Sequence, residues 1–169
     1  MRALSLQQPY ASAIIDGPQR IENRPRKMGL KAGDWIWIHA SLGFYFNMAE
    51  WITGSRYELQ ALWPEAPVGS RAYPRGVILG AALLGGTYEH LGPPQGWAVG
   101  PWCTQIEAVV ALPEPVPASG RLGLWKPPEG VMERCCAQVT HWTRVKHLEP
   151  EQAESFGLWV GRQMGRMEL

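Results

Sequence analysis

The segment RGVILGAALLGGTYEH, residues 75–90, constrains the fold more than any other part of the chain. It is a long apolar run, which predicts a buried central strand, and it is interrupted by Gly80, Gly85 and Gly86. Glycines inside a strand mark bends or bulges, and such bends curl a sheet towards a barrel. We therefore expect this strand at the centre of a small, strongly curved sheet.

The composition agrees with a chain of short strands. Its 169 residues include nine Trp, fifteen Pro and nineteen Gly, which is typical of strands joined by fixed turns rather than of a helical bundle. The length is that of one domain that can bury a core. We expect a single α+β domain over residues 1–169: a small, mostly antiparallel β-barrel with flanking helices, its core at about 3–145 and a C-terminal helical extension at about 149–168.

Charge, hydropathy and cysteines exclude several classes of function. The net charge is +1, so charge alone would not hold a long nucleic acid or an anionic membrane. No apolar run approaches the roughly 18 residues of a membrane helix, and the N-terminus lacks a secretory signal, so we expect a cytoplasmic protein with no membrane partner. The three cysteines show no metal-ligand spacing, so we expect no metal, no cofactor and no disulfide framework.

Local patterns predict the remaining elements. Alternation and turn residues predict five further strands, at 2–6, 35–38, 105–117, 120–128 and 133–145. The three prolines of the segment 105–117 are expected to halt its strand. Helical spacing predicts a helix of about two turns that begins at Pro9 and stops at Gly17 in the left-handed conformation. It also predicts a helix, or a pair broken near Gly54, at 47–63, and a helix within 149–167.

The end of the first helical segment supplies the most informative polar residues, Glu22, Asn23 and Arg24. In an extended segment Glu22 and Arg24 point to one face and Asn23 to the other. A carboxylate beside a guanidinium can recognise the edge of a base and hold a phosphate. The alternative is a structural ion pair that ties this segment to the sheet.

Other side chains are candidates on weaker grounds. His39 ends the buried strand, where it would act as a hydrogen-bond partner or general base in a cleft, or as a satisfied core histidine. Three aromatic residues lie near turns, namely Tyr10, Trp102 and Trp125. We expect each of them either to stack on a base or to pack in the core.

Polar groups near the same segment could bind a nucleic acid. Gln7 and Gln8 offer amides to a base edge, or else cap the first helix. The only basic cluster of the sequence contains Arg20, Arg24, Arg26, Lys27 and Lys31. We expect it either to contact a phosphate backbone or to form a solvated face.

Four segments in order resemble the ASCH (activating signal cointegrator homology) domain family: LSLQQPYASAIIDGPQRIENR, WIWIHAS, PRGVILGAALL and GPWCTQIEAVVALPEPVPASGRLGLW. Together they cover most of residues 3–126. The resemblance implies the PUA-like barrel fold of RNA-binding domains. It also implies that the segment around Glu22 lines a ligand cleft.

The chain departs from the family pattern at Gln19, where the family usually has lysine. Some small relatives are amidohydrolases of N4-acetylcytidine, and a lysine and a threonine of this segment carry their reaction; the matching positions here are Gln19 and Glu22. A glutamine has no basic amine that could activate a nucleophile. The resemblance therefore implies the fold more firmly than it implies this chemistry.

We expect a domain that binds RNA or a nucleotide, with a normal or a modified base, in a polar and aromatic cleft. DNA is an alternative ligand, and the oligomeric state is open. The binding residues expected are Gln8, Tyr10, Glu22, Asn23, Arg24, Arg26, Lys27, His39 and Trp102. One alternative is a ribonuclease or acylated-cytidine hydrolase with Glu22 or His39 as general base and Arg24 stabilising negative charge. Another is a protein-interaction or transcription-coregulator module that uses the apolar residues of the C-terminal helix, Phe156, Trp159, Val160 and Met164.

Overall fold

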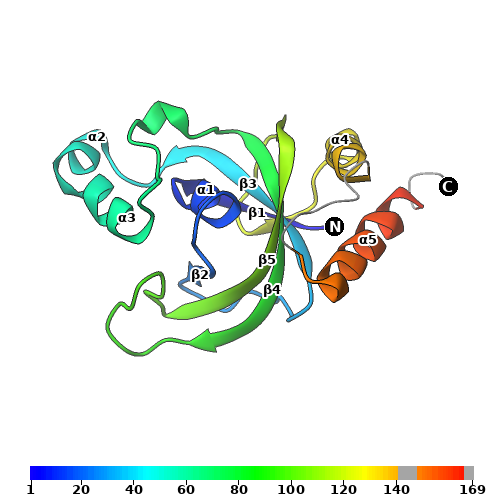
Figure 1. Cartoon of the computed structure of the whole chain (residues 1–169), viewed down its shortest axis with the longest axis horizontal. Helices are drawn as coiled ribbons and strands as arrows, with labels where there is room; N and C mark the ends of the chain where they lie inside the picture. The colour runs from blue at the N-terminus through cyan, green and yellow to red at the C-terminus, as the bar shows by residue number, and fades with distance from the viewer. Residues whose placement is uncertain (141–147, 166–169) are drawn as a thin grey trace.

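The computed structural model describes residues 1–140 and 148–165 and consists of one sheet with helices around it (Figure 1). The strands are β1 (Ala3–Gln8), β2 (Ile21–Arg24), β3 (Trp35–Phe44), β4 (Val77–Glu89), β5 (Trp102–Pro117) and β6 (Leu124–Trp125). The helices are α1 (Tyr10–Ile15), α2 (Met48–Glu50), the π-helix η1 (Trp51–Ser55), α3 (Arg56–Leu62), the short 3-10 helix η2 (Ser70–Ala72), α4 (Glu129–Thr140) and α5 (Pro150–Met164).

The six strands form one sheet in the order β2-β5-β4-β3-β1-β6. All neighbours are antiparallel except β1 and β3, which run parallel. The prediction of an α+β fold with a mostly antiparallel sheet is confirmed. The sheet is open, with β2 and β6 at its edges, so closure into a barrel stays a prediction.

The glycines of β4 lie where its pairing with β5 is irregular, as expected. The register shifts between Ile78 and Gly80, and again between Leu84 and Thr87, the span that holds Gly85 and Gly86. A Cβ at Gly80 would lie 2.3 Å from the carbonyl oxygen of Val110. Only glycine therefore allows the two backbones to approach so closely at this bend.

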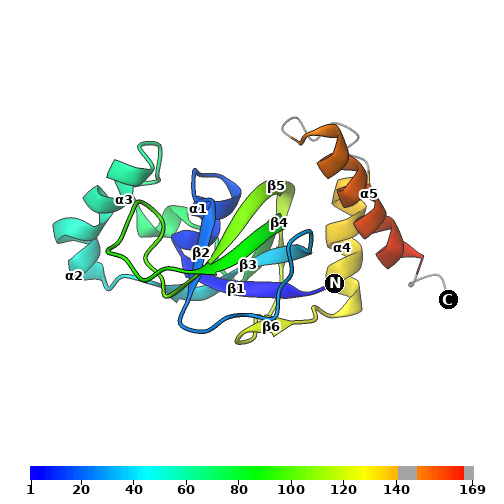
Figure 2. The same ribbon diagram turned by 90° about the horizontal axis from the view of Figure 1, so that it is seen from below.

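Helices cover the sheet on both sides (Figures 1 and 2). On one side α4 and α5 bury Cys135, Cys136, Phe156 and Val160 in a cluster with Trp35 and other sheet residues. On the other side α1 lies in the curve of the sheet and buries Ile14 and Ile15 against the opposite face of β3 and β4. A third cluster joins α1 to η1, α3 and the following loop through Trp51, Leu59, Trp63 and Tyr73.

The C-terminal helix was expected to carry either an exposed apolar patch or core residues. Phe156 and Val160 are each only 5% exposed, and the ring of Trp159 packs against Trp37 with centroids 5.0 Å apart. Met164 is 37% exposed. Core packing against the sheet therefore accounts for three of these four residues. Residues 166–168 of the expected extension lie outside the described part of the chain.

The first helix begins as expected, but it does not stop as expected. Pro9 lies directly before α1, and the Gln8 side chain caps the helix by accepting a hydrogen bond from Ser12 N at 3.1 Å. Gly17 does not have a positive φ. A Cβ there would lie 2.8 Å from the Trp63 ring and 2.9 Å from the carbonyl of Ala13, so close packing, rather than a left-handed turn, requires this glycine.

The prediction of a last strand at 133–145 is wrong for its described part, because residues 129–140 form α4. Val131, Cys135 and Val139 recur at four-residue spacing and are all buried, which is the pattern of one helix face. Residues 141–147 lie outside the described part of the chain.

Two other boundaries also differ from the expectation. Strand β5 continues through Pro113 and Pro115, which fall between the pairs Gly80–Ala111 and Ile78–Val116, where the ladder is interrupted and needs no N–H donor. The helical segment 48–62 does not break near Gly54 but widens there into the π-helix η1. Within residues 1–140 and 148–165, no helix is long and apolar enough to cross a membrane.

Candidate functional site

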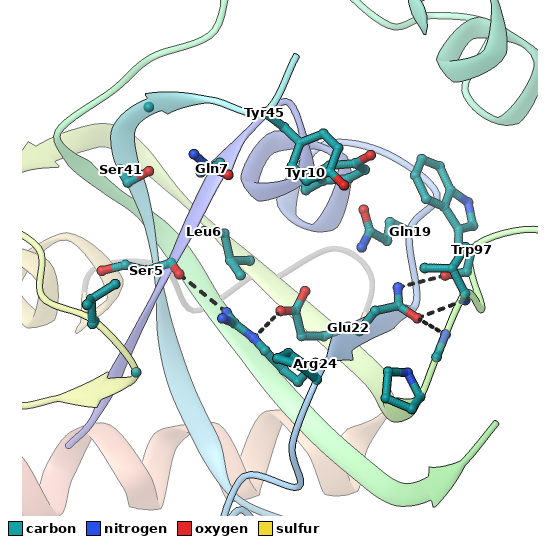
Figure 3. A pocket seen from close by; sticks show the side chains of 18 residues that line it. Ser5, Leu6, Gln7, Tyr10, Gln19, Glu22, Arg24, Ser41, Tyr45 and Trp97 are labelled. Carbon is teal, nitrogen blue, oxygen red and sulfur yellow. Dashed lines mark hydrogen bonds and ion pairs between the residues drawn. The ribbon is translucent and has the colours of Figure 1, made fainter. Parts of the chain in front are cut away.

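A cavity of about 740 Å³ opens between α1, β2 and the loops that flank the sheet (Figure 3). Its walls come from segments far apart in the sequence. The cavity is lined by polar and aromatic side chains, among them Gln19, Glu22, Arg24, Tyr10, Tyr45 and Trp97. The volume lies in the range of small-molecule and cofactor sites, and is large enough for one nucleotide.

Glu22 and Arg24 form a short ion pair in this cavity. Both belong to β2, two residues apart, and Nε of Arg24 lies 2.7 Å from Oε1 of Glu22. The Arg24 Nε–H does not align as a regular hydrogen bond, so the contact is mainly electrostatic. One terminal nitrogen of Arg24 donates to the carbonyl oxygen of Ser5, 3.3 Å away on β1. The expected placement of both side chains on one face is confirmed, and the hydrogen bond from Arg24 to Ser5 joins the edge strand β2 to β1 across the cavity.

Burial dominates the electrostatics of Glu22. Its side chain is 8% exposed, whereas that of Arg24 is 25% exposed. Loss of hydration raises the pKa of Glu22 from 4.5 to about 7, although the charge of Arg24 and its hydrogen-bonding capacity act in the opposite direction. Glu22 therefore exchanges its proton near neutral pH, which is unusual for a glutamate beside an arginine.

Gln19 contributes a buried acceptor without a partner. The residue is 2% exposed, and its Nε2 donates to the carbonyl oxygen of Ile21 at 2.8 Å. This bond fixes the orientation of the amide, because a flip would place two oxygens together. The Oε1 atom is buried and has no hydrogen-bond partner among the described residues. A buried acceptor of this kind is costly unless a ligand or water satisfies it.

Asn23 has a structural part in the site. Its Nδ2 donates to the carbonyl of Trp97 at 2.8 Å, and its Oδ1 accepts from the N–H groups of Val99 and Gly100 at 2.9 and 3.2 Å. The thiol of Cys103 also donates to Oδ1 at 3.3 Å. The oxygen of the amide is thus fully used, one N–H of Nδ2 has no partner among the described residues, and the amide holds the loop that carries Trp97 at the cavity wall.

Aromatic side chains line the opposite part of the cavity (Figure 3). Tyr10 packs edge to face on Tyr45, with ring centroids 5.0 Å apart. Burial raises the pKa of Tyr10 to about 12, so its hydroxyl stays protonated. Tyr45 is 59% exposed and presents a ring surface to solvent at the cavity. Sequence reasoning missed Tyr45 and Trp97. The aromatic run Phe44-Tyr45-Phe46 at the end of the strand β3 is the signal that was available for Tyr45.

Several expected binding residues lie elsewhere. Gln8 is fully buried, and its amide binds Ser12 and the carbonyl of Pro74. Trp102 pairs across the sheet with Arg24, and Lys27 lies over its ring at 5.6 Å. Arg26 and Lys27 are exposed and do not line the cavity. The structure therefore brings together Tyr10, Glu22, Asn23 and Arg24 of the expected set, but not these four residues.

His39 faces a second cavity, of about 810 Å³, and not the one that Glu22 lines. Its Nε2 lies 3.0 Å from the carbonyl oxygen of Ala118 and its Nδ1 lies 3.1 Å from Ser5 Oγ. A carbonyl only accepts, so Nε2 carries the proton and Nδ1 accepts from the serine hydroxyl. Burial lowers the pKa of His39. These contacts make it a neutral, satisfied core histidine.

Two other candidates also have structural contacts. Trp125 is 6% exposed and donates to Ser5 Oγ at 3.0 Å, so it packs in the core. Arg20 donates to the carbonyls of Ile14, Gly17 and Gln19, which closes the C-terminal end of α1. Arg20, a member of the basic cluster, therefore has a structural role at the end of this helix.

No group of three or more His, Cys, Asp or Glu side chains suited to a metal ion occurs in residues 1–140 and 148–165. A scan of the chain against models of protein families gave no match, and a search of curated proteins gave none either. The site must therefore be interpreted from its own geometry.

Proposed function

We propose that the protein binds RNA or a nucleotide in the cavity around Glu22 and Arg24. The observation that carries the proposal is the buried Glu22–Arg24 pair beside exposed aromatic surface in a cavity of about 740 Å³. The pair can hydrogen-bond to a base edge, and a free guanidinium N–H can reach a phosphate. Tyr45 and Trp97 offer ring surfaces on which a base can stack.

The resemblance to ASCH domains supports the same function and extends the proposal to the fold. In this proposal the curved six-stranded sheet around α1 is the counterpart of the PUA-like barrel. The exposed cations Arg26 and Lys27 follow β2 directly and would contact the backbone of a longer strand. DNA is a second possible ligand for such contacts.

Hydrolysis has less support than binding. Glu22 could act as a general base near neutral pH, but Gln19 has no amine to activate a nucleophile. His39 lies in the other cavity, so it does not act on a substrate held by Glu22.

The test compares Arg24→Ala with Arg71→Ala by fluorescence anisotropy on a short labelled single-stranded RNA. Arg71 is an exposed cation that does not line the cavity, so its removal controls for net charge. Loss of the charged hydrogen bonds of Arg24 should weaken binding about tenfold or more. The Arg71→Ala variant should bind like the parent, and circular dichroism should show both folded. Equal affinity of parent and Arg24→Ala, or no binding by the parent, would contradict the proposal.

A further inference from the structure

We propose that the polar wall of this cavity selects a guanine base. The inference rests on the binding function proposed above and names its ligand. Three side chains, Arg24, Glu22 and Gln19, follow one another along the wall and offer a donor, an acceptor and a second acceptor (Figure 3). This order complements the Watson–Crick edge of guanine.

Arg24 provides the donor. Its Nε faces Glu22 and one terminal nitrogen donates to Ser5, while the other terminal nitrogen has no partner among the described residues. A guanidinium has five N–H groups and no acceptor, so the atom placed beside it must be an acceptor. In guanine this atom would be O6.

Glu22 provides the middle acceptor. Its Oε1 is 2.7 Å from Arg24, and its second oxygen is directed into the cavity (Figure 3). Within the described residues this second oxygen has no hydrogen-bond partner. An ionised carboxylate only accepts, so it requires an N–H from the ligand, which in guanine is N1–H.

Gln19 provides the third group and the strongest evidence for a ligand. One N–H of its Nε2 is donated to the Ile21 carbonyl, which fixes the orientation of the amide, and its Oε1, which only accepts, is left without a donor. A site with a buried acceptor rejects an analogue that lacks the matching donor, because the acceptor then stays unpaired. In guanine the matching donor is the 2-amino group.

The other bases fail at one or more of the three positions. Uracil presents a carbonyl where Gln19 needs a donor, and hypoxanthine presents only a carbon-bound hydrogen there. Adenine and cytosine place an amino group against Arg24 and a ring nitrogen acceptor against Glu22. The first contact sets a donor against a donor and the second sets an acceptor against an acceptor, so adenine and cytosine should bind most weakly.

The experiment measures the dissociation constants of guanosine and inosine by isothermal titration calorimetry at pH 8. The two nucleosides differ only in the 2-amino group that Gln19 would bind. We expect guanosine to bind about tenfold or more tightly than inosine, and adenosine and cytidine to bind more weakly than either.

Gln19→Met isolates the acceptor because it keeps a side chain of similar length without an oxygen. In this variant the preference for guanosine over inosine should fall to about onefold. Gln105→Met is the matched control, since Gln105 is exposed on β5 and does not line the cavity, and it should keep the preference of the parent. A thermal melt of each variant establishes that it is folded.

The outcomes separate this inference from the function on which it rests. If the parent binds adenosine, cytidine or inosine as tightly as guanosine, the guanine preference is wrong although nucleotide binding stands. If Gln19→Met is folded and keeps the full preference, Gln19 does not read the 2-amino group. If the parent binds none of the nucleosides and does not bind the labelled RNA, both proposals are overturned.

Discussion

Nε of Arg24 lies 2.7 Å from Oε1 of Glu22, on adjacent same-face positions of an edge strand, yet the pKa of Glu22 is raised to about 7. The attraction of one arginine thus does not offset the hydration that Glu22 loses on burial. An ion pair of this kind contributes little to the stability of a fold. In the proposed function the pair is a recognition group that a ligand completes, and the protonation of Glu22 has measurable consequences.

The stability of the protein should fall as Glu22 ionises. Between about pH 4.5 and 7 the folded state keeps the proton of Glu22, whereas the unfolded state releases it, so the unfolding free energy decreases with rising pH across this window. The loss from this residue should be on the order of 3 kcal/mol. Glu22→Gln cannot ionise, and urea unfolding at several pH values should show a smaller decrease for it than for the parent. Parallel pH profiles would contradict the burial of Glu22 as its cause.

Binding of guanosine should depend on pH in the opposite sense. N1–H needs the ionised form of Glu22 as its acceptor, so affinity should rise with pH and level off above about pH 7. Arg24 on the same strand, Tyr10 on α1 and Tyr45 after β3 are the other charged or titratable side chains that line the cavity. Well below the pKa the affinity should change by close to tenfold per pH unit, which calorimetry can follow. A flat profile would exclude the carboxylate as the acceptor.

Asn23 should act on the site through the loop that it holds. Asn23→Ala removes all the bonds to Trp97, Val99 and Gly100, and should lower stability by about 1–3 kcal/mol. Asn23→Asp keeps the accepting oxygen but sets a second accepting oxygen against the carbonyl of Trp97, so it should also lose stability, and more where its carboxyl group is ionised. Urea unfolding of both variants gives the comparison. Unfolding of Asn23→Ala at the same urea concentration as the parent would contradict this role of Asn23.

Gly120 should be irreplaceable because it packs on the buried His39. A Cβ at Gly120 would lie 2.3 Å from Cε1 of His39 and 2.7 Å from Ser5 Oγ, and both side chains are held by hydrogen bonds. Gly120→Ala should therefore cost about 1–3 kcal/mol of unfolding free energy. Gly130→Ala, in α4 with open space around it, should be neutral or stabilising. A thermal melt in which Gly120→Ala equals the parent would contradict this packing.

Much of the sheet could be predicted from local pattern. The apolar run 35–38 and the glycine bends of β4 are properties of adjacent residues, and each lies where expected. The segment around Cys135 and Cys136 was wrongly predicted to be a strand. A short apolar run fits a strand or a buried helix equally well when its packing partners are not known. Pro113 and Pro115 fit into β5 because its pairing with β4 is interrupted there. This interruption depends on β4, so the sequence of β5 alone could not predict it.

The sequence by itself determined that Glu22 and Arg24 share a face, since side chains alternate along any strand, and that strands with glycine bends would dominate the chain. Only the tertiary structure decided what these groups face. The register of β2 on β5 positions the pair, and the bond from Gln19 N to the carbonyl of Ala13 holds Gln19 against α1 beside it. The hydrogen bond between His39 and the carbonyl of Ala118 holds His39 at the other cavity. Burial, and with it the pKa of Glu22 and the unpaired oxygen of Gln19, depends on residues distant in the chain, which no local pattern encodes.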